Sequence, residues 1–257
     1  MSPGASRSAP PAAWLAACPG ARVVAGEPPV ITGVTHDSRR VEPGFLFVAV
    51  PGFKTDGHVY IRDAIARGAA AVLAQEDRAG DIEPEGVCLV TAPDTRAALA
   101  PVSAAFWGWP ARQLAVIGVT GTDGKTTTTH LIAHVLGTAG IPAGFLSSVA
   151  FCTDGGEPRL NATHMTTVEA PEIQAALAEM VASRRRAAVL EASSHGLALY
   201  RLDACDFDVG VFTNLTRDHL DFHRTIEAYR DAKARLFELY RQTLGEARQL
   251  LEARPTH

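Results

Sequence analysis

The chain has 257 residues, enough for one large or two modest domains, and 47% of them are hydrophobic while 20% are charged. Its formal net charge of −4 argues against a nucleic-acid-binding surface as the main function. No apolar stretch is long enough for a secretory core or a membrane span, and the four cysteines lack the spacing typical of zinc sites or disulfides. We therefore expect a soluble, cytoplasmic protein without membrane insertion.

The first 110 residues have the pattern of a small α/β domain. Residues 1–20 are expected to be partly disordered, because the first ten are rich in Ser, Pro and Ala, although a helix can open near Trp14. The predicted strands are 30–34, 45–50, 70–73 and 87–90, and the predicted helices are 59–67 and 94–106. The sequence Trp107-Gly108-Trp109-Pro110 breaks this pattern, so we predict domains at 21–110 and 111–257.

The stretch VIGVTGTDGKTTTT, residues 116–129, has the order strand, glycine turn, lysine and helix. Glycines allow backbone N–H groups to approach phosphate oxygens, while a helix N-terminus and a lysine supply positive charge. The string Gly121-x-x-Gly124-Lys125-Thr126 is a compact variant of the Walker pattern, which has a glycine where this chain has Val119. A glycine turn with a solvated lysine is the alternative, but the flanking strand and helix favour a nucleoside triphosphate site.

The second domain continues as alternating short strands and helices, which predicts an α/β fold with a mostly parallel sheet. The predicted strands are 144–148, 187–190 and 209–213, the predicted helices are 171–182 and 225 to about 250, and 153–167 is expected to be irregular. In such sheets the site lies at the carboxyl ends of the strands. The phosphate loop, Glu191 and Asn214 would all emerge at that edge.

Glu191 is a candidate magnesium ligand. A carboxylate at a strand end beside a phosphate loop commonly holds Mg²⁺ together with the loop hydroxyl, here Thr126. Alternatively, Glu191 could cap a helix that begins at residue 193 or 194. His219 lies in a polar segment after a predicted strand, and this position by itself favours neither a metal ligand nor a structural role. Lys233, by its surroundings alone, reads as a solvated helix residue.

Four segments stand in a characteristic order: GVTGTDGKTTT (118–128), LEASSHGLA (190–198), FTNLTRDHLDFH (212–223) and EAYRDAKARLF (227–237). Together they resemble the Mur ligases, ATP-dependent amide-forming enzymes of peptidoglycan precursor synthesis. The segment VTHDSRRVEPGFLFVAVPGFKTDGHVYIRDAIARGAAAV (34–72) resembles the uridine-nucleotide-binding domain of the members that add the third residue of the peptidoglycan peptide. The resemblance implies an N-terminal uridine-nucleotide-binding α/β domain, followed by part of a P-loop-type ATPase domain with a mostly parallel sheet.

The resemblance implies a site for ATP and Mg²⁺ in the second domain. Lys125 would contact the phosphates, Thr126 and Glu191 would hold one magnesium ion, and His219 would help to hold a second. Lys233 matches a family lysine that is carbamylated, and a carbamate can bind a cation where an ammonium cannot. Lys125, Lys233 and His219 are therefore the implied catalytic residues. The implied ATP-binding residues are Gly121, Thr122, Asp123, Gly124, Lys125, Thr126 and Thr127, with Asp123 where the family commonly has asparagine.

Two further groups of residues match substrate-binding positions of the family. The positions that match the uridine-nucleotide site are His36, Ser38, Lys54 and Thr55. The positions that match the surroundings of the sugar-peptide are Thr166, Thr167, Ser193 and Arg201.

The implied reaction adds a diamino acid, meso-diaminopimelate or another such as lysine, to UDP-N-acetylmuramoyl-L-alanyl-D-glutamate through an acyl phosphate. A folylpolyglutamate synthase-like ligase and a non-catalytic protein that binds only the UDP-sugar or nucleotide are the alternatives. Family members continue into more strands and a third, amino-acid-binding domain, whereas residues 237–257 are helical and charged. We therefore expect that this polypeptide alone does not complete the reaction, and that a separate C-terminal half is a possible partner.

Overall fold

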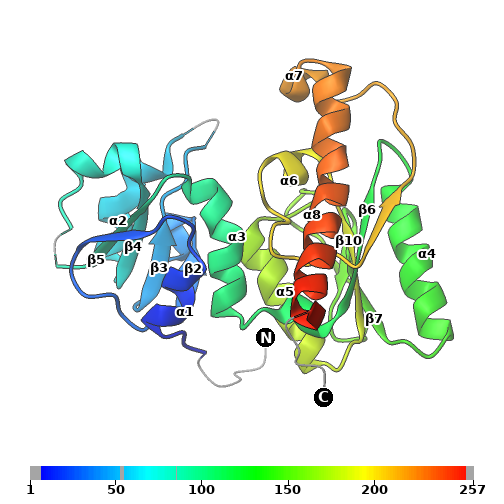
Figure 1. Ribbon diagram of the computed structural model, residues 1–257, viewed down its shortest axis with the longest axis horizontal. Helices are drawn as coiled ribbons and strands as arrows, with labels where there is room; N and C mark the ends of the chain where they lie inside the picture. The colour runs from blue at the N-terminus through cyan, green and yellow to red at the C-terminus, as the bar shows by residue number, and fades with distance from the viewer. Residues whose placement is uncertain (1–6, 53–54, 85, 253–257) are drawn as a thin grey trace. The chain divides into compact units, whose positions relative to one another are not determined.

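The computed structural model describes residues 7–52, 55–84 and 86–252, and the chain divides into two compact units, residues 1–108 and 109–257. Each unit contains its own mostly parallel sheet with helices packed on it, which confirms the predicted α/β fold class (Figure 1). Within the described part of the chain, no helix is both long and apolar enough to cross a membrane.

The first unit is built on a five-stranded sheet in the order β1-β5-β4-β3-β2, in which only β1 is antiparallel to its neighbour. Alternate residues of β3 point to opposite faces, and Phe47 packs on one face with Ile61 and Ala64 of α2. The elements are α1 (Pro11–Ala16), β1 (Arg22–Ala25), β2 (Gly33–Thr35), η1 (Ser38–Arg40), β3 (Phe45–Val48), η2 (Gly57–Tyr60), α2 (Ile61–Ala66), β4 (Ala71–Gln75), η3 (Glu76–Asp81), β5 (Cys88–Ala92) and α3 (Thr95–Phe106).

Two helices of the first unit illustrate how the sequence sets its boundaries. Asp94 caps α3 as its position suggests, because its carboxylate accepts a hydrogen bond from the Ala97 N–H at 2.9 Å. Helix α1 opens with proline, whose fixed φ suits the first turn, and buries Trp14 completely. Helix α1 thus lies where the sequence analysis expects that a helix can open, near Trp14.

The second unit is built on a six-stranded sheet in the order β11-β6-β10-β7-β8-β9. Strands β11, β6, β10 and β7 are parallel, and β8 and β9 add antiparallel strands at one side. The elements are η4 (Pro110–Gln113), β6 (Ala115–Thr120), α4 (Lys125–Thr138), β7 (Ala143–Leu146), β8 (Ala150–Cys152), β9 (Arg159–Leu160), α5 (Ala170–Ala182), β10 (Ala187–Glu191), α6 (Ser194–Ala198), β11 (Val209–Phe212), α7 (Leu220–His223) and α8 (Ile226–Glu252).

Helices cover both faces of this second sheet (Figure 1). Ile117 and Val119 of β6 pack toward the apolar side of α4, while Val116 packs in a cluster with residues of α5, α6 and α8. Helix α8 lies close to the sheet because Gly118 and Gly210 stand opposite each other on adjacent strands. A Cβ atom at Gly118 would come within 2.5 Å of the Leu236 side chain. The glycine pair therefore sets how deeply α8 packs.

Three strands were not predicted from the sequence. Strand β1 is mostly exposed, and β8 and β9 have only three and two residues. Strand β9 lies inside the segment 153–167 that we expected to be irregular. Each of these strands is short or exposed, so none has an apolar alternation long enough to be recognised.

Candidate functional site

The candidate site of the second unit lies where three neighbouring parallel strands end. Strand β6 lies between β10 and β11, with Glu191 opposite Val119 and Phe212 opposite Thr120. The segments that follow these strands therefore leave the sheet at the same edge, as expected for an open α/β sheet. They are the phosphate loop (121–124), the start of α6, and the β11–α7 loop (213–219).

Gly121 occupies a backbone conformation and a space that exclude a side chain. Its φ is +144°, and an added Cβ would lie 1.9 Å from the Thr213 hydroxyl oxygen. That hydroxyl instead donates to the Asp123 carbonyl at 2.6 Å. Gly124 has φ +81° and immediately precedes α4, so a second glycine turns the chain into the helix.

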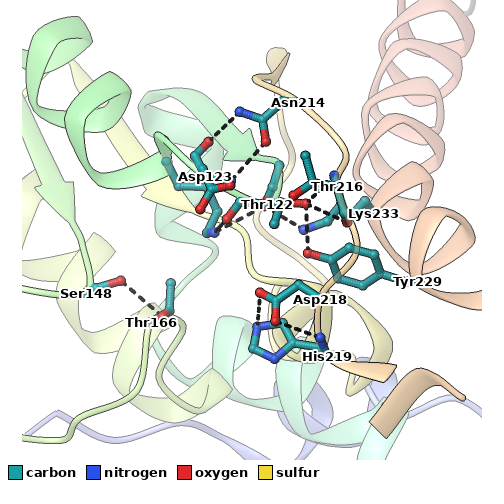
Figure 2. Close-up of polar contacts among 12 residues, drawn as sticks. Thr122, Asp123, Ser148, Thr166, Asn214, Thr216, Asp218, His219, Tyr229 and Lys233 are labelled. Carbon is teal, nitrogen blue, oxygen red and sulfur yellow. Dashed lines mark hydrogen bonds and ion pairs between the residues drawn. The ribbon is translucent and has the colours of Figure 1, made fainter. Parts of the chain in front are cut away.

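Asn214 and Thr122 fasten the phosphate loop to the β11–α7 loop (Figure 2). The Asn214 side-chain oxygen accepts from the Asp123 N–H at 3.0 Å, and its backbone carbonyl accepts from the Thr122 N–H at 3.0 Å. The Thr122 hydroxyl accepts from the Thr216 N–H at 3.0 Å. We call these contacts the loop brace, formed by Thr122, Asp123, Thr213, Asn214 and Thr216.

The loop brace determines which backbone groups remain for phosphate. The N–H groups of Thr122 and Asp123 are already used, whereas no described residue accepts from the N–H groups of residues 124–127. These four N–H donors lie at the N-terminus of α4, and the N-terminus of a helix is a favourable position for an anion. Lys125 Nζ donates to the carbonyls of Gly121 and Thr122 at 3.1 and 2.7 Å, so its charge lies over the same loop. The arrangement fits a polyphosphate group.

Glu191 is buried at the end of β10, with 2% of its surface exposed. Its two carboxylate oxygens accept from the Ser148 N–H at 2.9 Å and the Ser148 hydroxyl at 3.0 Å. The Ser148 hydroxyl also lies 3.0 Å from that of Thr166 (Figure 2). Glu191 does not cap α6, because the Ser193 hydroxyl accepts from the Gly196 N–H. The capping alternative for Glu191 is therefore wrong.

Lys233 is a buried residue rather than the solvated helix residue that its surroundings suggest. It is 1% exposed on α8, and its Nζ donates to the Gly121 carbonyl at 2.6 Å. Burial, followed by the charge of Lys125, lowers the pKa of Lys233 to about 8. Gly121 therefore accepts from two lysines, and the lowered pKa makes the neutral amine of Lys233 easier to form near neutral pH than that of a solvated lysine.

His219 follows the loop brace with φ 52° and a side chain that is 47% exposed. Its Nε2 lies 3.3 Å from an Asp218 carboxylate oxygen, and its ring lies 4.8 Å from that of His195. His195 packs 4.2 Å from Phe222, and burial, followed by the charge of His219, lowers its pKa. These contacts give His195 a packing role.

The donor set for magnesium is made of separate groups rather than a ready cage. Among the described residues, no three or more His, Cys, Asp or Glu side chains gather as a metal site. Mg²⁺ is commonly held by one or two carboxylates together with substrate phosphates and water. A buried carboxylate at Glu191 and the half-buried Thr126 at the second position of α4 fit that mode of binding.

The residues predicted to surround the sugar-peptide form one connected group. The Thr167 hydroxyl donates to the Glu191 carbonyl at 2.9 Å and accepts from the Ser193 N–H at 3.0 Å. Arg201 donates to the Thr167 carbonyl at 2.9 Å and pairs with Glu169 at 2.6 Å. The structure thus places Thr166, Thr167, Ser193 and Arg201 in continuous contact with the Glu191 region.

The residues predicted to bind the uridine nucleotide lie at one edge of the first unit. His36 and Ser38 follow β2, and Thr55 lies in the segment after the neighbouring parallel strand β3. Ser38 is 6% exposed and hydrogen-bonds the Asp63 carboxylate, which lowers the pKa of Asp63. The His36 Nδ1 is buried and has no partner among the described residues. Lys54 lies outside the described residues.

Two known family models match most of the chain: "Mur ligase family, catalytic domain" over residues 30–107 and "Mur ligase middle domain" over residues 119–244. The chain belongs to the Mur ligase family. The predicted family is confirmed, and Mur ligases as a family are ATP-dependent enzymes that form amide bonds in peptidoglycan precursor synthesis. The individual site residues remain predictions.

Relatives of this Mur ligase chain are more than twice as long as the part it matches. A UDP-N-acetylmuramyl-tripeptide synthetase of Deinococcus radiodurans is 49% identical over 208 residues, 81% of this chain and 42% of that protein. A UDP-N-acetylmuramoyl-L-alanyl-D-glutamate--2,6-diaminopimelate ligase of Caldanaerobacter subterraneus subsp. tengcongensis is 41% identical over 217 residues, 84% of this chain and 44% of that protein. A solved structure of a ligase with the latter name matches 85% of this chain and 43% of its own, with TM-score 0.70 and 33% identity.

Several residues of the site were missed by the sequence analysis. Asn214 was expected at the strand edge but received no role, Thr213 and Thr216 were noted only as part of a polar segment after a buried strand, and Ser148 was expected only at the end of a strand. Each acts through a contact to a segment more than forty residues away in the chain. A polar residue directly after a buried strand was the available signal for Thr213 and Asn214, and no local signal identifies Ser148.

Proposed function

We propose that this chain carries the UDP-sugar-binding and ATP-binding parts of a ligase that adds a diamino acid to UDP-N-acetylmuramoyl-L-alanyl-D-glutamate. The names of the similar proteins from Deinococcus and Caldanaerobacter support this substrate class. The observation that carries the proposal is the set of open N–H groups at residues 124–127 beside Lys125 and the buried Lys233. Such a set is suited to hold the phosphates of ATP.

The reaction transfers the terminal phosphoryl group of ATP to a carboxylate, which leaves ADP and an acyl phosphate. Attack by the amine of the diamino acid then forms the amide and releases phosphate. Lys125 and the α4 N–H groups would hold the phosphates and stabilise the negative charge of the transferred group. Magnesium, when bound, would supply further charge neutralisation, held by Thr126 and Glu191 and, at a second position, by His219 and Lys233.

Lys233 is proposed to act as a carbamate, and its surroundings favour that modification. A neutral amine attacks the carbon of CO₂, a C–N bond forms, and one proton is released to solvent. The lowered pKa of Lys233, about 8, makes the neutral amine available near neutral pH. Carbon-13 NMR in labelled bicarbonate at neutral pH should show a carbamate signal that is missing from Lys233→Met. An unmodified Lys233 under those conditions would disprove this role.

The proposed function is tested by binding and turnover on the 257-residue chain. Calorimetry should detect Mg-ATP and UDP-N-acetylmuramoyl-dipeptide as two independent ligands. A coupled ADP-release assay with the dipeptide nucleotide and diaminopimelate or lysine then measures catalysis. Binding of both ligands without ADP release identifies a binding role for this chain alone. Absence of Mg-ATP binding would refute the assignment, and ADP release that requires a folate substrate instead would favour a folylpolyglutamate synthase-like ligase.

A further inference from the structure

The hydroxyl of Thr122 uses its complete hydrogen-bonding capacity. A hydroxyl donates one hydrogen bond and accepts two. The Thr122 oxygen donates to the Thr216 carbonyl at 3.3 Å and accepts from the Thr216 N–H at 3.0 Å. The third contact, at 3.1 Å, is the hydroxyl of Tyr229 on α8. Tyr229 therefore completes the loop brace from a helix that starts more than one hundred residues after the phosphate loop.

Tyr229 is fixed in place by its own surroundings. It is 1% exposed, and its ring lies beside Lys233 (Figure 2), 4.4 Å from the Nζ atom, and 5.2 Å from the His223 ring. Its hydroxyl is the donor in the hydrogen bond to the Thr122 oxygen. A buried ring that cannot rotate away holds its hydroxyl at one point of the phosphate loop.

We propose that Tyr229 is a positioning residue for nucleotide binding, which acts through the Thr122 hydroxyl and not by touching the nucleotide. This inference rests on the proposed ATP site. With Thr122 held on one side by Thr216 and on the other by Tyr229, the chain between Gly121 and Gly124 keeps one path. That path presents the free N–H groups of residues 124–127 before the phosphates arrive, which lowers the ordering cost of binding.

The test compares two variants that each remove one hydroxyl from α8. Tyr229→Phe keeps the ring against Lys233 and removes only the contact to Thr122. Tyr240→Phe is the matched control, since Tyr240 packs beside the core and its hydroxyl has no hydrogen bond among the described residues. Calorimetry with Mg-ADP should show about fivefold weaker binding for Tyr229→Phe and unchanged binding for Tyr240→Phe. Amide hydrogen exchange in residues 121–124 should be faster only in Tyr229→Phe.

A double-mutant cycle distinguishes action through Thr122 from a general loss of packing. In a Thr122→Val background, Tyr229→Phe should have no further effect on Mg-ADP affinity, because the acceptor is already gone. In a Thr122→Ser background, which keeps the hydroxyl, the fivefold effect should return. Equal effects of Tyr229→Phe in all three backgrounds, or an affinity within twofold of the wild type, would overturn the inference. A wild-type chain that does not bind Mg-ADP would refute the proposed function itself.

Discussion

The carboxyl edges of the two sheets carry the two predicted binding sites, and they are organised differently. In the second unit, the phosphate loop is held by contacts from the β11–α7 loop and from α8. In the first unit, the predicted residues make contacts over shorter chain separations: Thr55 hydrogen-bonds Tyr60 at 3.2 Å, and Ser38 hydrogen-bonds Asp63. The phosphate-loop edge of the second unit is therefore braced by segments far away in the chain, whereas the predicted uridine edge of the first unit uses contacts between nearer segments. Affinity for ATP should depend on distant contacts, and affinity for the UDP-sugar should not.

Of the substitutions that test this comparison, Gly121→Ala should have the largest effect, and it should act on the phosphate-loop edge. The alanine would have to adopt a φ of +144°, and its Cβ would clash with the Thr213 hydroxyl. The hydrogen bond from that hydroxyl to the Asp123 carbonyl would therefore be lost. We expect Mg-ATP binding to fall below detection and the free energy of unfolding to fall by about 2–3 kcal/mol. Denaturant titration and calorimetry measure both. Gly137→Ala in α4 is the control, because an added Cβ there has no other atom within 4 Å. Its free energy of unfolding should rise by about 0.5–1 kcal/mol.

Lys125→Ala should weaken binding at the ATP site and leave binding at the uridine site unchanged, without unfolding either unit. Removing the charge beside the phosphates should weaken Mg-ATP binding by about 100-fold. Binding of the UDP-sugar should remain, because the candidate uridine residues belong to the other unit. Calorimetry with each ligand provides the measurement. Equal losses for both ligands would contradict the assignment of the sites to separate units.

Lys233 should give the second unit a characteristic dependence on pH. Its pKa is lowered to about 8 in the folded chain from an ordinary 10.5, so between these values the unfolded chain binds more protons. The free energy of unfolding should therefore rise with pH from about 8 to 10.5, by at most about 3 kcal/mol. Denaturant titrations over this range should show the rise in the wild type and not in Lys233→Met. A parallel pH dependence of both proteins would show that Lys233 is not the group responsible.

Ser38→Ala should have the smallest effect. It removes one buried hydroxyl at the uridine edge and one hydrogen bond to Asp63. We expect about fivefold weaker binding of the UDP-sugar and unchanged binding of Mg-ATP. Titration calorimetry with both ligands tests this. If Mg-ATP affinity changed as much as UDP-sugar affinity, the contrast between the two edges would be wrong.

The sequence predicts most of what depends on local pattern. The buried strands at 45–48, 71–75, 115–120 and 187–191 have apolar runs, and the glycine-lysine spacing identifies the phosphate loop. The burial of Lys233 could not be predicted from the neighbouring sequence, because it depends on how α8 packs on the sheet. The loop brace could not be read either, since Asn214 and Asp123 are 91 residues apart and meet only because β6 and β11 are neighbours.

The rotation of helix α8 about its own axis determines both a core contact and a contact in the candidate site. Leu236 packs over Gly118, while Lys233, one turn earlier on the same side, reaches the Gly121 carbonyl. Each residue in a helix advances the side-chain direction by about 100°. One residue inserted between Lys233 and Leu236 would keep either the core contact or the lysine contact, but not both. Helix α8 can therefore vary in composition on its exposed side, as at Arg230 and Asp231, but not in length between Lys233 and Leu236.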